Sequence, residues 1–513
     1  MYASIIAMIG GFVAVKLFAD RRVPQKLWSL LSQEKASRFV FALLLTIFSV
    51  GLTVLGILRH YSFHSNALDM GLMDQILWNT VNGHLLQETF TSNQSQNFLG
   101  HHFSPSLLLL SPLYFVAPSP MLLVAVQVLF VCLGVMLIYR LLIETTGEPL
   151  LALSTAFALL FHPFLHDALL FDFHQDIIGF FFGICALYGW CKQKRWFALL
   201  CWVIALCSKE EMAVYGAVFG LFLLVAQIRD RRFGLYFAVV HIAWLILIVE
   251  YVLPWFRNVP STSFEFYSRY SLPVSLWDFL TPARVGGLAQ IVLPFAYFLW
   301  SKQKLNLLLL APLSINFLSN LEGQHSFRFH YSLLPLLAIV AACIYAAREY
   351  NQKPIAATSL RKQILFQFVC ASLLFVGVSP LGLKIPATIA QYTITTHVRN
   401  GHEFLKSVPE DSAIIAQNRL AAHLGQRRQI TLVSRNLQIQ PEYYLFDLKS
   451  SPAPLDQTQY FQLLIGLLSG TDYGAIHAGD GYLLLQKGAT ITNNNAVLSC
   501  IKRIRIDCDA INF

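Results

Sequence analysis

The sequence predicts a polytopic membrane protein that is mainly α-helical and carries a small α/β domain at its C-terminal end. Of its 513 residues, 56% are hydrophobic and only 13% are charged, and the mean hydropathy is +0.56. Soluble domains carry about 25% charged residues. The composition therefore excludes an ordinary soluble enzyme, a disordered tail protein and a nucleic-acid-binding protein.

About twelve apolar runs are candidates for transmembrane helices, since a span takes roughly 20 mostly apolar residues. They lie near 2–19, 39–58, 119–139, 149–166, 177–191, 196–208, 212–228, 234–253, 285–300, 305–320, 331–347 and 363–382. A further run at 104–117 is too short to span and is flanked by prolines. We expect it to be re-entrant or to lie in the membrane interface.

The charges are distributed unevenly along the chain. Lys and Arg total 37 and Asp and Glu total 28, a formal excess of +9. The basic clusters fall in alternate loops: Arg21/Arg22/Lys26/Lys35/Arg38, Lys192/Lys194/Arg195, Arg229/Arg231/Arg232, Lys302/Lys304 and Arg348/Lys353/Arg361/Lys362. Cytoplasmic loops carry such an excess. We therefore expect both termini on the non-cytoplasmic side, with residues 2–19 an uncleaved span because a basic n-region and an A-x-A site are lacking.

The loops on the other side hold acids and histidines. They include Asp69, Asp74, His101 and His102 in the loop 59–118, then Asp172, His174, Lys209, Glu210, Arg269, Arg328 and His330. Ionisable groups at membrane depth are costly and point to function. Together these residues predict a polar cavity at the outer membrane face.

From Lys384 onward the hydropathy changes, and alternating patterns predict strands. Strands are expected at 412–417, 429–433 and 443–448, a helix at 457–468, and a hairpin at 473–486 that turns at Gly479-Asp480-Gly481. We divide the chain into an extra N-terminal helix with a basic loop (1–38), a transmembrane core (39–382) and an exported α/β domain (383–513).

Metal, nucleotide and disulfide signals are weak. No G-x-x-x-x-G-K-[ST], G-x-G-x-x-G or H-E-x-x-H motif is present. The His and Asp residues are ligand types for Zn²⁺ or Mn²⁺, but their spacing is loose, so we predict no bound metal or other cofactor and favour hydrogen-bonded cavity walls or phosphate contacts. Whether Cys500 and Cys508 pair stays open.

Several ordered motifs resemble one family. They are Asp69-Met70-Gly71-Leu72-Met73-Asp74 with Asn82-Gly83-His84; Gly100-His101-His102-Phe103-Ser104-Pro105; Phe171-Asp172-Phe173-His174; Ser208-Lys209-Glu210-Glu211; His330-Tyr331; and Ala416-Gln417-Asn418 through His423 to Arg427. The set is similar to DUF2079, a family of predicted bacterial membrane proteins. That family in turn resembles the GT-C glycosyltransferases, which are multi-span enzymes.

The GT-C resemblance implies a catalytic acid in the first large external loop, and Asp69 occupies that place. A second acid often follows directly, but position 70 is Met here. The next acid, Asp74, would lie about 140° around a helix from Asp69, so it either shares the site or caps the helix that follows. The string His101 to Pro105 resembles a Lys-Pro-Pro-like element of these enzymes.

The resemblance implies that a sugar passes from a polyprenyl-phosphate carrier to an external glycan, lipid or protein, in a multi-pass protein of the bacterial plasma membrane. Asp69 would be the base, and Lys209 and Arg328 would contact phosphate. Lys209 could instead pair with Glu210 or Glu211. The remaining candidates for substrate binding are His101, His102, Asp172, His174, Glu210, Arg269 and His330. A lipid-linked-sugar translocase and a non-catalytic scaffold are the alternatives.

The orientation can be tested by fusing a reporter to the C terminus. Because the basic clusters occupy alternate loops, we expect a periplasmic reporter such as alkaline phosphatase to be active there. A fusion placed after Arg195 is the matched control and should be inactive. An active cytoplasmic reporter at the C terminus would overturn the orientation.

Overall fold

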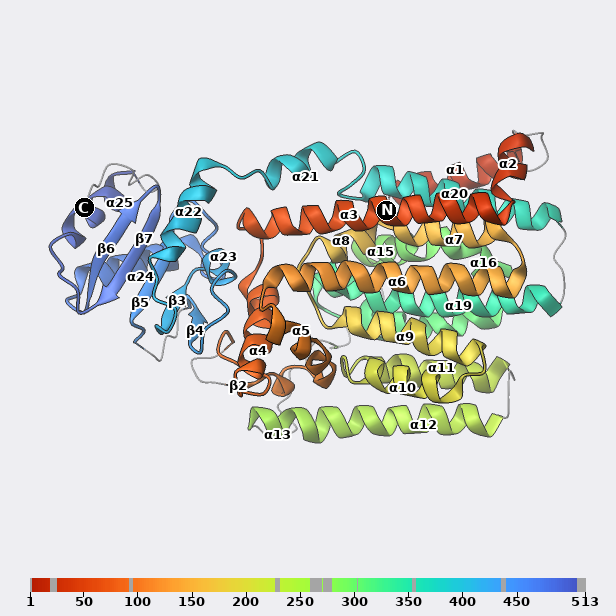
Figure 1. Cartoon of the computed structure of the whole chain (residues 1–513), viewed down its shortest axis with the longest axis horizontal. Coiled ribbons are helices and arrows are strands. Elements are labelled where there is room, and N and C mark those ends of the chain that lie inside the picture. The colour runs from red at the N-terminus through yellow and green to blue at the C-terminus, as the bar shows by residue number, and fades with distance from the viewer. Residues whose placement is uncertain are drawn as a thin grey trace.

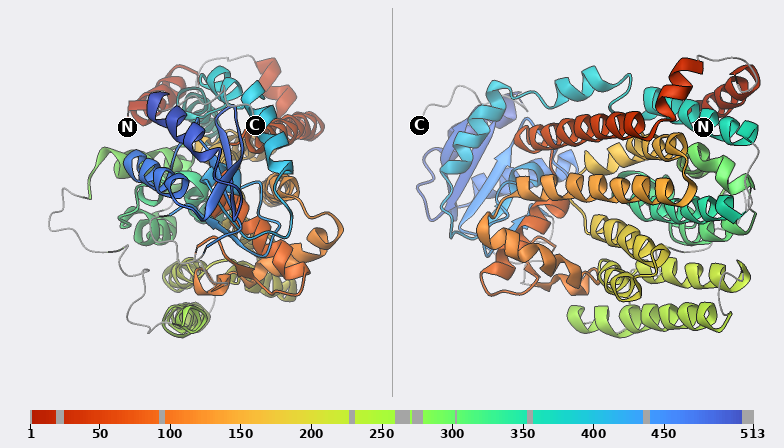
Figure 2. Two further views of the ribbon diagram at one scale, coloured as in Figure 1. Left: turned by 90° about the vertical axis from the view of Figure 1, so that its left-hand side faces the viewer. Right: turned by 45° about the vertical axis from the view of Figure 1, so that its right-hand side comes forward.

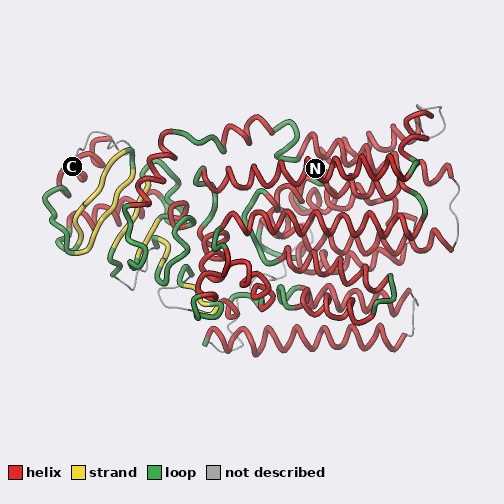
Figure 3. The backbone as a smooth tube through the Cα atoms, in the orientation of Figure 1, coloured by secondary structure: helices red, strands yellow, loops and turns green. Residues whose placement is uncertain are grey.

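The computed structural model describes residues 2–18, 25–91, 96–226, 231–258, 270, 279–301, 303–352, 357–434 and 440–504. Long helices lie side by side in a bundle, and an α/β region sits at one end of it (Figure 1). The strands gather in that region, apart from one short pair near the end of the bundle (Figure 3). The predicted combination of a helical core and a small C-terminal sheet is therefore observed.

The bundle contains long and short helices. They are α1 (Tyr2–Phe18), α2 (Gln25–Leu31), α3 (Glu34–Tyr61), α6 (Pro120–Thr146), α7 (Pro149–Leu160), α8 (Pro163–Leu169), α9 (Asp176–Cys191), α10 (Arg195–Leu206), α11 (Met212–Ala226), α12 (Arg231–Leu247), α13 (Leu253–Arg257), α15 (Pro282–Val292), α16 (Ala296–Ser301), α17 (Leu310–Pro312), α18 (Glu322–His325), α19 (Leu333–Gln352) and α20 (Ala357–Val378). Short π and 3₁₀ turns connect some of them: η4 (Ile248–Val252), η7 (Leu293–Phe295), η8 (Gln303–Leu309), η9 (Leu313–Phe317) and η10 (Phe329–Ser332).

Local sequence explains where α6 begins and ends. Pro120 is its first residue, and the Ser119 hydroxyl accepts a hydrogen bond from the N–H of Met121 at 3.2 Å. Proline at the first helical position and serine at the cap are both favoured. Gly147 follows the helix with φ +67°, a left-handed conformation that ends helices and that glycine adopts without strain.

Six helices in the described residues are long and apolar enough to cross a membrane. They are Glu34–Tyr61, Pro120–Thr146, Arg231–Arg257, Pro282–Leu299, Glu322–Glu349 and Ser359–Val378. A seventh crossing results if α7 and α8, which are bent by 49° at a short break, count as one span. The other predicted spans correspond to shorter apolar helices such as α9, α10 and α11, so the number twelve stays a prediction.

The loop between α3 and α6 folds into short elements at the end of the bundle that faces the α/β region (Figure 1). They are η1 (Ala67–Gly71), α4 (Leu72–Val81), β1 (Gln87–Glu88), β2 (Gln96–Asn97), η2 (Phe98–Gly100), η3 (Pro105–Leu110) and α5 (Ser111–Val116). The apolar run 104–117 thus forms two six-residue helices, each far shorter than a span.

The C-terminal α/β region, residues 396–504, contains a five-stranded sheet. Its elements are α22 (Thr396–Lys406), β3 (Ile414–Ala416), α23 (Asn418–Ala421), β4 (Ile430–Leu432), β5 (Tyr443–Asp447), α24 (Gln457–Ser469), β6 (Tyr473–Gly479), β7 (Tyr482–Lys487) and α25 (Asn494–Ile504), preceded by α21 (Ile385–Gln391). The strand order is β4-β3-β5-β7-β6. β3 pairs in parallel with β4 and β5, whereas β7 pairs antiparallel with β5 and β6.

The predictions for this region are confirmed element by element. All five predicted strands and the predicted helix are present within one or two residues. α24 begins with a capping box, in which the Asp456 carboxylate accepts from the N–H of Gln459 at 2.9 Å. One face of the sheet packs with α24 and α25 into its own apolar core, which includes Ile415, Phe446 and Leu464. Cys500 is disulfide-bonded, and Cys508 lies outside the described residues.

The two ends of the bundle differ in chemistry. α9 and α11 begin next to the acidic and histidine-rich loops and end at Cys191 and Ala226, close to the basic clusters. The end of the bundle away from the α/β region holds the first residues of α12 and α20 and the last residues of α19 (Figures 1 and 2). The basic clusters in the described residues therefore share the end opposite the acids and histidines, as alternate loops require.

Two glycines let α11 and α12 pack closely. A Cβ atom on Gly220 would lie 2.6 Å from the backbone nitrogen of Ala238, and one on Gly234 would lie 2.7 Å from that of Leu224. Small residues at helix–helix contacts allow this approach in membranes. By contrast, a Cβ on Gly51 in α3 would meet nothing within 4 Å.

Gly220→Leu should therefore destabilise the protein, whereas Gly51→Leu should leave it nearly unchanged. Forcing a side chain into a full interface costs roughly 1–3 kcal/mol, so we expect a clear fall in the thermal unfolding midpoint of the Gly220 variant in detergent. The midpoint is measured by the loss of the monodisperse size-exclusion peak. Equal midpoints for the two variants would contradict the observed packing.

Candidate functional site

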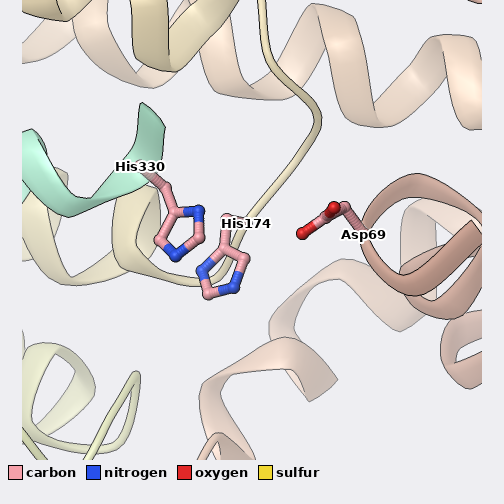
Figure 4. Close-up of side chains that lie close together, drawn as sticks. All are labelled: Asp69, His174 and His330. Atoms are coloured by element: carbon pink, nitrogen blue, oxygen red, sulfur yellow. The ribbon is translucent and has the colours of Figure 1, made fainter. Parts of the chain in front are cut away.

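The acids and histidines of separate loops come together where α3 ends and where α9 and α11 begin. Atoms of Asp69, His174 and His330 that could act as ligands lie within 4.8 Å of one another. Figure 4 shows the two imidazole rings side by side and the Asp69 carboxyl group directed toward them. These three residues come from η1, from the loop before α9 and from η10.

Asp69 lies in η1, a five-residue π-helical turn that precedes α4. Such turns are rare in proteins, and those that occur often lie at functional sites. The side chain is half-buried, and this burial, with the nearby charge of Asp172, raises the pKa of Asp69 to about 7 although Arg59 opposes the shift. Near neutral pH the carboxyl group can therefore both accept and release a proton, as a general base must.

His174 is oriented by a carboxylate. Its Nδ1 contacts Oδ2 of Asp176, the first residue of α9. Burial lowers the pKa of His174 to about 4, although Asp176 opposes the shift. The ring is consequently neutral, and the Asp176 contact assigns the proton to Nδ1. Nε2 then carries a lone pair that can accept a hydrogen bond.

The His330 ring stacks on the His174 ring. The ring centroids lie 3.5 Å apart and the planes differ by 3°. His330 is 6% exposed, and its Nδ1 has no hydrogen-bond partner among the described residues. An imidazole binds a metal in its ring plane at about 2.0–2.1 Å. A single cation midway between these rings would lie about 1.75 Å out of each ring plane, half of the 3.5 Å separation. The two rings as they stand therefore do not suit a shared metal ion.

Strained backbone holds His330 in place. Phe327 and Phe329 have φ values of 59° and 57°, which bulky side chains rarely adopt. The Asp167 carboxylate accepts hydrogen bonds from Nη2 of Arg328 at 3.0 Å and from the N–H of Phe329 at 3.1 Å. Such strain persists only where neighbouring contacts enforce it, and it gathers at functional sites.

Lys209 is buried between two carboxylates. Its Nζ lies 3.3 Å from Oδ1 of Asp176 and 3.4 Å from Oε2 of Glu211, and 5.4 Å from the ring centroid of Tyr331. Gln324 donates to the second oxygen of Glu211 at 3.2 Å. Only 1% of Lys209 is exposed. Its ammonium group contacts Asp176, the carboxylate that orients His174. A phosphate could reach Lys209 only by displacing one of its carboxylate partners.

His102 and His101 lie next to this network, each beside a buried glutamate. Nδ1 of His102 lies 2.8 Å from Oε1 of Glu210, whose other oxygen accepts from the N–H of Phe103. The His102 ring makes an edge contact with that of His174, with centroids 6.3 Å apart. His101 faces the other way, with Nε2 3.3 Å from Oε1 of Glu88.

Asp172 forms a buried ion pair with Arg59, the third residue from the end of α3. Oδ2 of Asp172 also accepts from the N–H of Asn66 at 2.9 Å, directly before the Asp69 turn. Although Arg59 opposes the shift, burial raises the pKa of Asp172. The pair thus supports the turn from the bundle side.

Asp74 lies apart from the cluster. Its Oδ1 accepts from the Tyr114 hydroxyl at 2.8 Å and from Nε2 of Gln426 at 3.0 Å. Burial raises the pKa of Asp74 to about 6, and only 2% of the residue is exposed. These contacts join the loop between α3 and α6 to the C-terminal α/β region. Arg269, another predicted site residue, lies outside the described residues.

The network holds more acids than bases. Among the described residues, the five carboxyl groups of Asp69, Asp172, Asp176, Glu210 and Glu211 share two cations, Arg59 and Lys209. Uncompensated buried charge is costly, and burial raises the pKa of both Asp69 and Glu211. The network is therefore arranged to hold protons.

Sequence reasoning did not select four residues that complete this network: Arg59, Asp167, Asp176 and Glu211. Asp167, Asp176 and Glu211 carried a signal, because they stand in the same polar loops as the selected residues. Arg59 stands at the end of an apolar run next to His60. Its position resembles an interfacial anchor, and only the fold shows its pairing with Asp172.

A comparison with models of known protein families identifies the family of this chain. The model of the predicted membrane protein family DUF2079 matches residues 59–484. The chain belongs to this family. The match includes the Asp69 turn, the network around His174 and most of the C-terminal α/β region. No curated protein matches the chain.

Among solved structures, the chain resembles ArnT from Cupriavidus metallidurans bound to undecaprenyl phosphate. The TM-score is 0.53 at 12% identity, over 87% of this chain and 98% of that one. The apo structure of the same ArnT gives a TM-score of 0.48 at 13% identity, over the same shares. At such identity the likeness to the bound structure shows a shared fold.

The Asp69 carboxyl group should react with dicyclohexylcarbodiimide, which adds to protonated carboxyl groups in apolar surroundings. Because burial and Asp172 raise the pKa of Asp69 to about 7, labelling should be strong at about pH 6, half-maximal near pH 7 and weak at about pH 8.5. Mass spectrometry of the peptide containing Asp69 measures the labelled fraction. Asp69→Asn is the control for the labelled site, and equal labelling at about pH 6 and pH 8.5 would contradict the shift.

Proposed function

We propose that this protein transfers a sugar from a polyprenyl-phosphate donor to an acceptor hydroxyl at the outer face of the bacterial plasma membrane. The observation that carries the proposal is the half-buried Asp69 carboxyl group, with its pKa near 7, facing an imidazole that Asp176 orients. The ArnT-like fold supports it, since the matched ArnT structure holds undecaprenyl phosphate.

An apolar cavity supports a lipid-linked donor. It has a volume of about 620 Å³, lies between α9, α10, α11, α12 and α19, and has Trp202, Phe219 and Leu337 among its walls. Tyr215, one helical turn beyond Glu211, lines it too. At the far end stand Trp190 and Arg195. Ligand pockets have about this size and apolar character, and a polyprenyl chain is the matching part of the donor.

In the proposed reaction Asp69 takes the proton of the acceptor hydroxyl. The acceptor oxygen bonds to the anomeric carbon of the sugar as the bond from that carbon to the phosphate oxygen breaks, and the polyprenyl phosphate leaves. Because its pKa lies near 7, Asp69 can then release that proton to water. His174, whose pKa burial lowers to about 4, stays neutral beside Asp69 with its orientation set by the Asp176 carboxylate.

Among the described residues, Arg328 is the cation that we assign to the leaving phosphate. About half of its side chain is exposed, and its contacts with Asp167 use two of its five N–H groups. The remaining N–H groups can donate to phosphate oxygens as charge develops. Lys209 acts in this proposal on Asp176 rather than on the phosphate.

A translocase would need ionisable groups free within its spans. The notable candidates in the described helices are His241 in α12 and Glu250 in η4, and Glu250 lies close to the end of its span. His241 is the deeper of the two. Its Nε2 accepts from the indole N–H of Trp202 at 2.7 Å, and its Nδ1 bonds to the carbonyl of Phe237 at 2.6 Å. A histidine bonded at both nitrogens is a packed core residue, which favours the transferase.

The proposal is tested with Asp69→Asn in a strain that lacks the native protein. Envelope glycans and lipid-linked sugars are compared by mass spectrometry. Removal of a positioned base costs about 10²–10⁴-fold in rate, so the variant should fail to restore the glycan that the wild type restores. Asp411→Asn, at an exposed position, is the control. Full restoration by Asp69→Asn, at equal protein level, would refute the proposal.

A further inference from the structure

The turn that carries Asp69 is capped from the C-terminal α/β region. Ala67 begins η1, and its backbone N–H donates to Oδ1 of Asn418 at 2.7 Å. The first N–H groups of a helical turn have no partner inside the turn, and an asparagine side chain is a favoured acceptor for them. The preceding Asn66 makes no side-chain cap. The acceptor therefore comes from 351 positions away in the chain.

Asn418 is held firmly because its neighbour is anchored in the sheet. Gln417 is fully buried. Its amide donates to the hydroxyl of Ser450 at 2.9 Å, and its carbonyl accepts from the N–H of Asp447 at 2.8 Å and the hydroxyl of Tyr460 at 3.0 Å. Asn418 then begins α23, so the core of the α/β region fixes the position of its side chain.

The two backbones meet without room for a methyl group. A Cβ on Gly71, the last residue of η1, would lie 3.0 Å from the Cα of Ala422. A Cβ on Gly425 would lie 2.7 Å from the carbonyl oxygen of Gly71 and 2.9 Å from Oδ2 of Asp74. The turn thus lies directly against residues 418–425, and both segments belong to motifs through which the chain resembles its family.

Further contacts extend along α4. Nε2 of Gln426 donates to Asp74 at 3.0 Å, and Nε2 of Gln75 donates to the carbonyl of Arg427 at 2.9 Å. On the other side of the turn, Asp172 accepts from the N–H of Asn66. The Asp69 turn is therefore held between the bundle on one side and the segment 418–427 on the other.

We propose that Asn418 is a positioning residue for Asp69 and that the segment 418–427 holds the Asp69 turn at its depth in the site. The C-terminal α/β region is then part of the machinery of the site. Loosening the turn would let Asp69 move toward water and away from Asp172, Arg59, His174 and His330, the groups that face it. Its proton affinity would fall toward that of an exposed aspartate.

The test compares carbodiimide labelling of Asp69 across pH in the full-length wild type, Asn418→Ala and Asn400→Ala. Asn400 is the matched control, because its amide donates to Asp480 at 2.8 Å within the α/β region. We expect the labelling midpoint of Asn418→Ala to fall by at least about half a pH unit, with faster hydrogen–deuterium exchange in the peptide containing residues 66–71. Asn400→Ala should match the wild type in both measurements.

A wild-type midpoint in Asn418→Ala, in protein with a wild-type unfolding temperature, would overturn the proposal. If Asn418→Ala does not fold, Asn418→Ser is used, because it shortens the side chain and leaves a smaller gap. A change in exchange without a change in midpoint would also overturn it, since that pattern is a purely structural role. Labelling follows the Asp69 carboxyl group itself, so the result is independent of the proposed sugar transfer.

Discussion

The Asp176 carboxylate is the group on which the arrangement of the site depends. It stands at the first residue of α9, contacts Nδ1 of His174 with one oxygen and accepts from Lys209 with both. The contact with Nδ1 places the proton of the neutral His174 ring on that nitrogen, so the lone pair is on Nε2. His330 stacks on the same ring. Without Asp176, the positive charge of Lys209 would be compensated by Glu211 alone, and His174 would lose the contact that orients its ring.

Buried charge constrains the rest of the network. Removing one partner from a buried pair leaves an uncompensated charge and is strongly destabilising. Most charged members accordingly have a specific partner: Arg59 with Asp172, Lys209 with Asp176 and Glu211, and Glu210 with His102. Asp69 is the exception, since its neighbours in the described part of the chain are two imidazoles and it forms no ion pair there. The carboxyl group without an ion pair among the described residues is therefore also the one whose pKa burial raises to about 7.

The position of Asp69 joins the membrane bundle to the C-terminal α/β region. The turn carrying it is bonded to Asp172 on the bundle side and to Asn418 on the other. Asp74 extends the same junction through Tyr114 and Gln426. A carboxyl group whose proton affinity depends on its depth benefits from two rigid neighbours, because small displacements in a region of low dielectric change that affinity strongly.

Local patterns were sufficient for much of the fold. Period-two alternation located the strands at 414–416 and 443–447, and the glycines at 479 and 481 located the hairpin. Proline and serine at 119–120 mark the start of α6. These features depend on neighbours in the sequence. The π-turn at Asp69 and the irregular segment 303–317 were not predictable in the same way, because their geometry is set by packing against distant elements.

The sequence by itself determined the membrane class, the family, the alternation of basic and acidic loops, and Asp69 as the residue of greatest interest. Hydropathy, charge order and ordered motifs are properties of the chain and need no contacts. Only the tertiary structure decided the partners. Lys209 pairs with Asp176 as well as Glu211, Asp74 joins the α/β region instead of the cluster, and Asn418 caps a turn 351 positions away. Such pairings depend on which loops the helices bring together, and helix length and packing settle that in three dimensions.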